Sequence, residues 1–561
     1  MNKPNLIDAF LEEQSTLQTA VTEFSSQHDS APSQAKYYQK LLPLEMPGEG
    51  EQYAFEVDLD KCSGCKGCVT ACHNLNGLSE EETWRDVGSI HGGTWENPFV
   101  QTVTTACHHC VEPGCMEGCP TLAYDKDPTT GIVKHLDDQC IGCQYCTFKC
   151  PYEVPKYNKS MGIVRKCDMC SNRLEVGEAP ACVQGCPTEA ISIKIVKQAD
   201  LLERAEEGVF LPGAPDPSYT KPTTTYKRKE SIPENAEAAD KFSMNPEHAH
   251  MPLVIMTILT QVSVGVFSMD WIAGVLGLNP NALTPYKALA ALILGIVALN
   301  AAILHLGRPL YAWRAIIGLK TSWMSREILA FGAFAGAAKA YALVLWLPNL
   351  REYLPLELIP IFIDKDLPLP LGAAVVITGL GGVFSSGMIY VDTKRIFWNF
   401  SRSMGKFFGT ALVMGISGLI LATVVFEFYL NGSESLINLT KNHLNWAWVA
   451  LPIAVSAKLI FEQRVMLHLK GGNDYLHRTA LLLTGPLKRP YWFRMATGIG
   501  GGIVLPIVLL FVQFYASVNF TGWFIFSFTV ISFLILLVGE FLERILFFSA
   551  VVSPKMPGGF Q

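Results

Sequence analysis

The sequence predicts a two-part protein, in which an N-terminal cysteine-rich α+β domain precedes a C-terminal all-α bundle of eight transmembrane helices. All sixteen cysteines of the 561 residues lie between Cys62 and Cys186. Hydrophobic residues make up 50% of the chain and its mean hydropathy is positive, which indicates a membrane portion. Apolar segments long enough to cross a bilayer follow one another from Met251 onward.

The cysteines fall into four groups of four whose spacing is typical of ferredoxins. The first and third groups read C-x2-C-x2-C-x3-C, and the other two keep the outer gaps but widen the middle one. In such a run, three closely spaced thiolates hold one cubane and the fourth binds the other cluster of a pair. The spacing therefore predicts a tandem ferredoxin-like domain with four [4Fe-4S] clusters. The groups are Cys62, Cys65, Cys68 and Cys72; Cys107, Cys110, Cys115 and Cys119; Cys140, Cys143, Cys146 and Cys150; and Cys167, Cys170, Cys182 and Cys186.

Disulfides and structural zinc are the two other uses of cysteine that compete with this interpretation. Disulfides need an oxidising compartment, and sixteen cysteines in such tight runs would favour scrambled pairing. Zinc sites use two CxxC pairs and do not require a third cysteine at x2 and a fourth at x3 before a proline. Iron-sulfur clusters explain the full pattern four times over.

Composition divides the chain into four regions. Residues 1–50 are expected to form a weakly helical extension, 51–200 the ferredoxin-like domain, 201–250 a polar, proline-rich linker, and 251–561 the membrane domain. The first seventeen residues are polar and acidic and show no signal peptide, so export on a signal of this chain is not expected. The net charge of −6 argues against nucleic acid as a partner.

Eight apolar segments approach the roughly 20 residues that a spanning helix needs. A large soluble protein with buried helices would not give eight such segments in succession. The predicted spans are 251–273, 287–307, 327–348, 368–390, 407–430, 444–461, 495–516 and 522–547.

Loop charge predicts the orientation of these spans. With eight spans, the cysteine-rich domain and the even-numbered connections share one side of the membrane. Those connections carry fourteen lysines and arginines, against four in the opposite connections, Lys287, Arg351, Lys365 and Lys441. The positive-inside rule therefore places the cysteine-rich domain at the cytoplasmic face of the inner membrane, with the periplasmic face as the alternative.

Histidines suggest which carrier exchanges electrons in the membrane. A di-haem subunit needs pairs of axial histidines within its helices, but the four histidines after residue 251 lie at helix ends or in loops. We therefore expect no haem, and a quinone as the lipid-soluble carrier. His305 ends the second predicted span and Glu327 begins the third, so both face the clusters, and a titratable pair suits a carrier of two protons and two electrons. The alternatives are an interfacial anchor for His305 and a helix-start carboxylate for Glu327.

The two halves resemble two subunits of dimethyl sulfoxide reductase-type molybdoenzymes. The cysteine groups resemble the iron-sulfur subunit, and three motifs resemble the membrane anchor: His305-Leu306-Gly307-Arg308-Pro309, Ser325-Arg326-Glu327-Ile328 and Gly539-Glu540-Phe541-Leu542. The chain thus looks like a fusion of both subunits. The resemblance implies that His305 and Glu327 bind menaquinol, or ubiquinol in its place, and it makes Arg308 and Arg326 further candidates for quinone binding.

The resemblance also implies how the cysteines pair, the first group with the fourth and the second with the third. A cysteine at position 143, where nitrate reductase relatives carry tryptophan, implies four irons in the cluster nearest the membrane. The implied ligand sets are Cys62, Cys65, Cys68 and Cys186; Cys72, Cys167, Cys170 and Cys182; Cys107, Cys110, Cys115 and Cys150; and Cys119, Cys140, Cys143 and Cys146.

Two features depart from that family. Its soluble subunits lie outside the cytoplasmic membrane, whereas the loop charges here favour the inside. Lysines also occur within spans, Lys339 in the third and Lys458 in the sixth, and a lysine at bilayer depth marks a polar pathway or a buried pair. We expect Lys339 to pair with Glu427 or Asp270 and to line a proton or quinone route; a snorkelling or merely paired lysine is the alternative.

Three functions remain open from the sequence. In the first, the chain oxidises quinol and passes electrons through four clusters to a separate molybdopterin subunit. In the second, electrons run from a dehydrogenase, such as a formate oxidiser, to quinone. In the third, electron transfer drives an ion pump, which requires ionisable residues spaced across the bilayer. The chain has no Walker motif, no Rossmann fingerprint and no cysteine to spare for molybdenum, so substrate conversion is expected on a partner.

Overall fold

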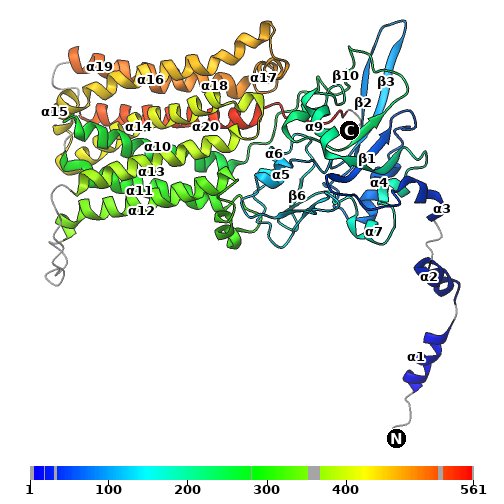
Figure 1. The fold of residues 1–561 in the computed structure, drawn as a ribbon. Coiled ribbons are helices and arrows are strands. Elements are labelled where there is room, and N and C mark those ends of the chain that lie inside the picture. Colours follow the sequence, from blue (N-terminus) through cyan, green and yellow to red (C-terminus); the bar gives the residue numbers. More distant parts are fainter. Residues whose placement is uncertain are drawn as a thin grey trace.

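The computed structural model describes residues 6–17, 19–30, 35–278, 281–350, 367–515 and 522–558. A cysteine-rich α+β domain and a helical bundle lie end to end, which confirms the predicted fold class (Figure 1). Two short N-terminal helices, α1 (Leu6–Thr16) and α2 (Ala20–Ser30), extend away from the domain with exposed side chains.

Four small sheets build the cysteine-rich domain. In the first, β1 (Glu51–Asp58) lies between antiparallel β8 (Ile191–Lys197) and parallel β9 (Thr225–Lys227). In the second, β2 (Asp86–Gly93) lies between β3 (Pro98–Thr105) and β10 (Glu237–Ala238). The other two are hairpins, β4 (Tyr124–Lys126) with β5 (Val133–His135) and β6 (Lys156–Asn158) with β7 (Ile163–Arg165).

Short helices follow the cysteine-bearing loops. They are α4 (Gly67–Leu75), α5 (Gly114–Glu117), α6 (Tyr145–Lys149), α7 (Ser171–Glu175) and α8 (Ala181–Gln184). The residues that precede α4, α6 and α7 have left-handed backbone, which turns the chain sharply from each cysteine loop into its helix.

The stretch 201–250 differs from the expected linker. It completes α9 (Gln198–Glu206) and supplies β9 and β10, each of which pairs with a strand of the cysteine-rich domain. Its prolines lie between these short elements, where no ladder hydrogen bond is needed. Much of the stretch is therefore part of the domain.

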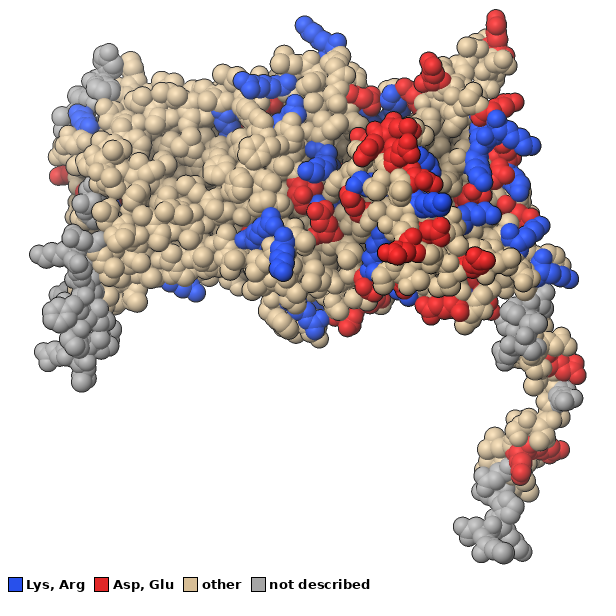
Figure 2. Space-filling view, viewed as in Figure 1, with Lys and Arg blue, Asp and Glu red and all other residues tan. Residues whose placement is uncertain are grey.

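Eight helical spans are long and apolar enough to cross a membrane, as predicted, within the ranges that the structure describes. Charged side chains are sparse over the bundle and dense over the cysteine-rich domain (Figure 2). The spans are α10 (Met251–Val275), α11 (Thr284–Ile303), α12 (Trp323–Leu350), α13 (Pro368–Val391), α14 (Phe400–Asn431), Ser435–Lys470 with α16 (Asn445–Gln463), Lys488–Val512 with α18 (Lys488–Ile499) and α19 (Leu505–Tyr515), and α20 (Gly522–Ser549).

Three of the charges counted in the loops form buried ion pairs between helices of the bundle instead. Lys406 of α14 and Arg494 of α18 are buried in ion pairs with glutamates, and Lys287 of α11 pairs with Asp270 of α10. Without these three, the excess of positive charge remains: the connections on the side of the cysteine-rich domain carry twelve lysines and arginines, and those on the opposite side carry three. Two of those three, Arg351 and Lys365, lie outside the described residues.

The two halves meet at α6, and the C-terminal tail joins them a second time. Tyr145 Oη donates to Ile389 O at 2.9 Å, and Lys149 Nζ lies 2.8 Å from Asp392 Oδ2 at the end of α13. The residues after α20 return to the cysteine-rich domain, where Ser89 N of β2 donates to Gly558 O at 3.0 Å. The position of the cysteine groups relative to the bundle is thus fixed by buried contacts and by two passages of the chain.

Candidate functional site

All sixteen cysteines are free thiols, and most are buried. Burial, and then the charge of Cys182, raise the pKa of the Cys72 thiol to about 12. Burial also raises the pKa of Cys110, with Cys107 and Cys150 next in effect. Thiols with raised pKa values are protonated at neutral pH, so metal binding must displace protons.

The thiols that act on one another fall mostly, but not only, within the ligand sets that the family resemblance implies, since Cys182 also acts on Cys68 and Cys107 on Cys167. Cys143 and Cys146 lie near Cys119 and Cys140, and Cys115 lies near Cys107, Cys110 and Cys150. Cys72 lies near Cys170 and Cys182, and Cys68 near Cys186. Among the described residues, no three histidine, cysteine or acidic side chains gather as a single metal ion would require. In a cubane cluster each of the four thiolates binds a different iron, which is the use of cysteine that the spacing predicts.

A mostly apolar cavity of about 350 Å³ lies where the third cysteine group meets the bundle. Its wall includes Cys143 from the cysteine-rich domain, His305 from the turn just after α11, and Glu327 from α12. Trp313 and Ile328 line it as well and are 66% and 37% exposed, so the cavity reaches the outer surface between these residues. An apolar pocket with a few polar groups is what an amphipathic ring compound needs.

His305 presents an open acceptor in this cavity. Its Nδ1 contacts Ala302 O, a carbonyl that can only accept, so the ring proton is assigned to Nδ1. Its Nε2 is buried and has no hydrogen-bond partner among the described residues. Burial is the main cause that lowers the pKa of His305 to about 4, partly offset by the Ala302 carbonyl. The imidazole is therefore neutral at pH 7, with a free lone pair on Nε2.

Glu327 is the fifth residue of α12, just past its first turn, and is 7% exposed. Ser386 of α13 hydrogen-bonds to its carboxyl group. Within the described ranges, no cation lies at ion-pair distance from Glu327. An isolated carboxylate beside an apolar cavity is a proton acceptor or donor for a bound ligand.

The other three predicted quinone residues lie away from this cavity. Arg308 Nη1 donates to Asp137 O at 2.7 Å and so ties the bundle to the cysteine-rich domain. Arg326 donates to two backbone carbonyls and stacks 4.4 Å over the ring of Trp323. Lys339 is exposed on α12, and no carboxylate lies at ion-pair distance from it in the part of the chain that the structure describes. The expected ion pair of Lys339 with Glu427 or Asp270 is therefore wrong.

Tyr390 is a cavity residue that the sequence did not reveal. It ends α13 and lines the cavity beside Glu327, with its ring 5.2 Å from those of Trp398 and Phe547. No motif in the sequence marks it. Its proximity to Glu327 arises only because α13 packs along α12.

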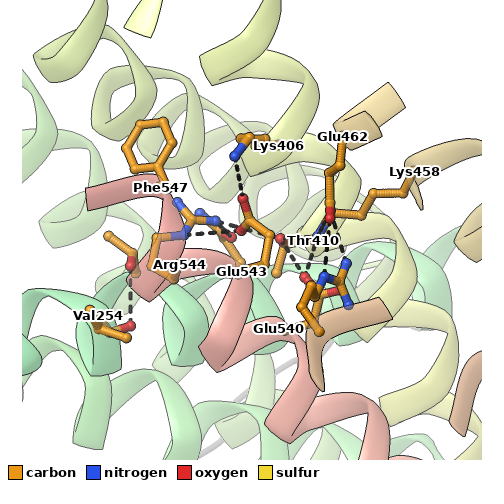
Figure 3. A network of polar contacts seen from close by, with 12 residues as sticks. Val254, Lys406, Thr410, Lys458, Glu462, Glu540, Glu543, Arg544 and Phe547 are labelled. Carbon is orange, nitrogen blue, oxygen red and sulfur yellow. Dashed lines mark hydrogen bonds and ion pairs between the residues drawn. The ribbon is translucent and has the colours of Figure 1, made fainter. Parts of the chain in front are cut away.

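Lys458, the second lysine noted within a span, belongs to a buried set of charges around α20, here called the α20 charge network (Figure 3). Glu540 contacts Lys458 Nζ, and its Oε1 lies 2.9 Å from Arg494 Nη2. Glu543 lies 3.1 Å from Lys406 Nζ. The network consists of Lys406, Lys458, Glu462, Arg494, Glu540, Glu543 and Arg544. The network joins α20 to α14, α16 and α18. Its charged side chains lie in the half of the bundle near the cysteine-rich domain.

Comparison with known proteins gives two family matches. Residues 98–196 match the family described as a 4Fe-4S dicluster domain, and residues 244–550 match the family described as the DMSO reductase anchor subunit (DmsC). The second match covers more than half of the chain.

Curated relatives match the cysteine-rich half. The probable anaerobic dimethyl sulfoxide reductase chain YnfG of Escherichia coli (strain K12) is 35% identical over 186 residues, which are 31% of this chain and 88% of that protein. A subunit of the anaerobic dimethyl sulfoxide reductase of Haemophilus influenzae is 37% identical over 150 residues, 25% of this chain and 73% of that protein. The iron-sulfur subunit of the nitrate-inducible formate dehydrogenase of E. coli (strain K12) is 34% identical over 189 residues, 29% of this chain and 62% of that protein.

Proposed function

Because the chain belongs to the DMSO reductase anchor subunit family and carries an iron-sulfur domain in the same polypeptide, we propose that it oxidises quinol in the membrane and passes the electrons to a separate catalytic subunit. The observation that carries this proposal is the shared cavity. A cysteine of the third group, Cys143, and the two titratable residues His305 and Glu327 line the same apolar space. A quinol bound there would lie beside both its electron acceptor and its proton acceptors.

Quinol oxidation releases two protons and two electrons. The free Nε2 of His305 can accept one proton, and the carboxylate of Glu327 the other. A [4Fe-4S] cluster held by Cys119, Cys140, Cys143 and Cys146 would supply a one-electron acceptor at the cavity wall. The apolar wall around the two groups holds the quinol ring and keeps bulk water away, which strengthens the polar contacts.

Electrons would leave at the opposite end of the domain. There Cys65 is exposed, as is Trp95, which is 100% exposed between β2 and β3. We propose that a molybdopterin-containing catalytic subunit docks on this surface, next to a cluster held by Cys62, Cys65, Cys68 and Cys186. Purification of the complex from membranes should recover such a large subunit. Recovery of this chain alone, with full quinol-to-acceptor activity, would disprove the need for it.

The cavity is tested by two conservative substitutions and one control. In His305→Gln and Glu327→Gln, quinol should reduce the clusters at least tenfold more slowly, because one proton acceptor is missing, while dithionite should still reduce all of them. Lys339→Met is the control, since Lys339 lies outside the cavity, and it should behave like the wild type. Unchanged quinol oxidation in both cavity variants would refute the proposed site.

The formate dehydrogenase relative supports a second direction of flow, from a dehydrogenase to quinone through the same cavity. The two directions differ in the order of the cluster potentials, which redox titration measures. An ion pump has less support, because the α20 charge network and the cavity both lie in the cluster-side half of the bundle. We propose that no haem takes part, and the absorption spectrum of the purified chain tests this directly.

The loop charges support the cytoplasmic face of the inner membrane for the cysteine-rich domain. Reporter fusions to the C-terminal end distinguish the two faces, because the tail packs on that domain. An alkaline phosphatase fusion that is active there would place the domain in the periplasm and reverse the proposal.

A further inference from the structure

Two buried basic residues lie between the cysteine groups of the cysteine-rich domain. Arg85, just before β2, is 2% exposed, and Lys166, just after β7, is 3% exposed. No carboxylate lies at ion-pair distance from either side chain within the described residues. An unpaired cation in a protein interior is costly, so a group that the chain itself does not supply must compensate these two charges.

The charged neighbours of Arg85 are thiols of two different ligand sets. Cys68 belongs to the outermost proposed cluster, and Cys72, Cys167 and Cys182 belong to the next. All four lie close enough to act on the guanidinium, and Thr104 Oγ1, which Arg85 contacts, lies 3.5 Å from Cys68 Sγ. The guanidinium donates to Thr104 Oγ1 at 3.2 Å, while its Nε and Nη2 are buried without a partner in the described chain. Two donors thus remain free among the sulfurs of two sets.

Lys166 also lies between two ligand sets, the second and the third, and is thus closer to the membrane than Arg85. Its Nζ lies 3.6 Å from Cys107 Sγ and donates to the carbonyl of Cys167 at 2.7 Å. Cys107 belongs to the third proposed cluster and Cys167 to the second. The side chain of Lys166 therefore contacts a thiol of one ligand set and the backbone of the next, and it lies between the two sets.

The junction nearest the membrane has a neutral residue instead. Tyr124, which carries a phenol and no charge, lies near Cys115 of the third set and near Cys119 and Cys146 of the fourth. Arg308 also acts on Cys140, but it is only half-buried, so water screens its charge. Lys126 acts on Cys110 from a partly buried position, and Asp168, also part-exposed, opposes Lys166 near Cys167.

We infer that Arg85 and Lys166 raise the reduction potentials of the outer clusters above that of the membrane-proximal cluster, and so direct electrons from the quinol cavity toward the catalytic partner. This inference rests on the proposed function and specifies the direction of electron flow, from the quinol cavity to the catalytic partner. A buried cation favours the reduced cluster, because reduction adds one negative charge close to it. With cations at the two outer junctions and a phenol at the inner one, the potentials of the three outer clusters, and of the second cluster most, lie above that of the membrane-proximal cluster.

Redox titration of the intact chain in membranes, followed by electron paramagnetic resonance, tests the inference without quinol. In Arg85→Gln, the two outer clusters should become at least tenfold harder to reduce, a downward shift of about 59 mV or more for one electron, while the membrane-proximal cluster stays in place. In Lys166→Gln, the second and third clusters should shift in the same direction. Lys134→Gln is the control: Lys134, on β5, is part-exposed and paired with Glu175 at 3.3 Å, and its loss should shift no cluster.

Charge-conserving variants separate charge from packing. Arg85→Lys and Lys166→Arg should keep potentials near the wild-type values, and iron content per chain confirms that the clusters are present. The inference is overturned if the Gln variants keep full iron content and unchanged potentials, or if Arg85→Lys shifts as far as Arg85→Gln. If Arg85→Gln loses its clusters, the potentials of the second and third clusters in Lys166→Gln decide whether the inference holds. Failure of quinol oxidation with normal potentials would instead count against the cavity.

Discussion

Replacing Glu540 by Gln should loosen the attachment of α20 to the three helices around it. Glu540 is fully buried and contacts Lys458, Arg494 Nη2 at 2.9 Å and Thr410 Oγ1 at 2.7 Å. The α20 charge network holds four cations and three carboxylates, so Glu540→Gln raises its net charge from +1 to +2. Breaking one partner of a buried pair costs about 3–5 kcal/mol, because the remaining charge stays buried.

A double-mutant cycle with Lys458→Met measures how much of that cost belongs to the pair. The double variant returns the network to +1, so it should recover about 2–3 kcal/mol relative to the sum of the two single variants. Unfolding in detergent, followed by the helical circular dichroism signal, gives the stabilities. Glu434→Gln, on an exposed carboxylate, is the control and should change stability by less than about 0.5 kcal/mol. Additive losses, or a single-variant loss below about 1 kcal/mol, would show that the network does not hold α20 in place.

Three further outcomes are expected. Asp392→Asn removes the charge opposite the buried Lys149, so quinol-driven cluster reduction should slow while dithionite reduction persists; an unchanged rate would show that this contact does not position Cys143. The pKa of His305 is about 4 in the folded chain against an ordinary 6.5, so between these values the unfolded chain binds more protons than the folded one and stability should rise with pH. The wild type should therefore gain more stability over this pH window than His305→Gln. The same rise of melting temperature with pH in both proteins would contradict a neutral, buried His305. Gly142→Ala should separate the two halves, since the new Cβ would lie 2.9 Å from Gly307 Cα on the bundle side, besides 2.3 Å from Gly162 O in its own domain. Gly277→Ala, at a similar positive φ with open space around it, should carry only the backbone cost of about 1 kcal/mol; equal effects would exclude the clash.

The sequence predicted the features that depend on neighbours along the chain. Cysteine spacing reflects how a short loop wraps one cluster, and an apolar run of about 20 residues reflects the thickness of a bilayer. Both are local properties, so the cysteine groups and the eight spans could be recognised from residues alone. His305 and Glu327 could be placed together because both flank the same short connection.

Features that depend on helix packing could not be predicted. Tyr390 reaches the cavity because α13 lies along α12, and Arg494 meets Glu540 only through the contact of α18 with α20. Lys339 shows the same limit, since its expected partner Asp270 is taken by Lys287 from another helix. A linear sequence gives the depth of a residue in the membrane but not the direction in which its side chain points.

The return of the C-terminal tail to the edge of β2 has a consequence for biogenesis. Beyond the short pairing of β2 with β10, the backbone N–H of Ser89 donates to Gly558 O, so this part of the edge stays unpaired until the last helix has crossed the membrane and residue 558 has been made. An odd number of crossings would leave the tail on the wrong side and the edge unpaired. Pairing of the tail with β2 therefore requires an even number of membrane crossings. In chains with an odd number, the unpaired strand edge would be open to proteases.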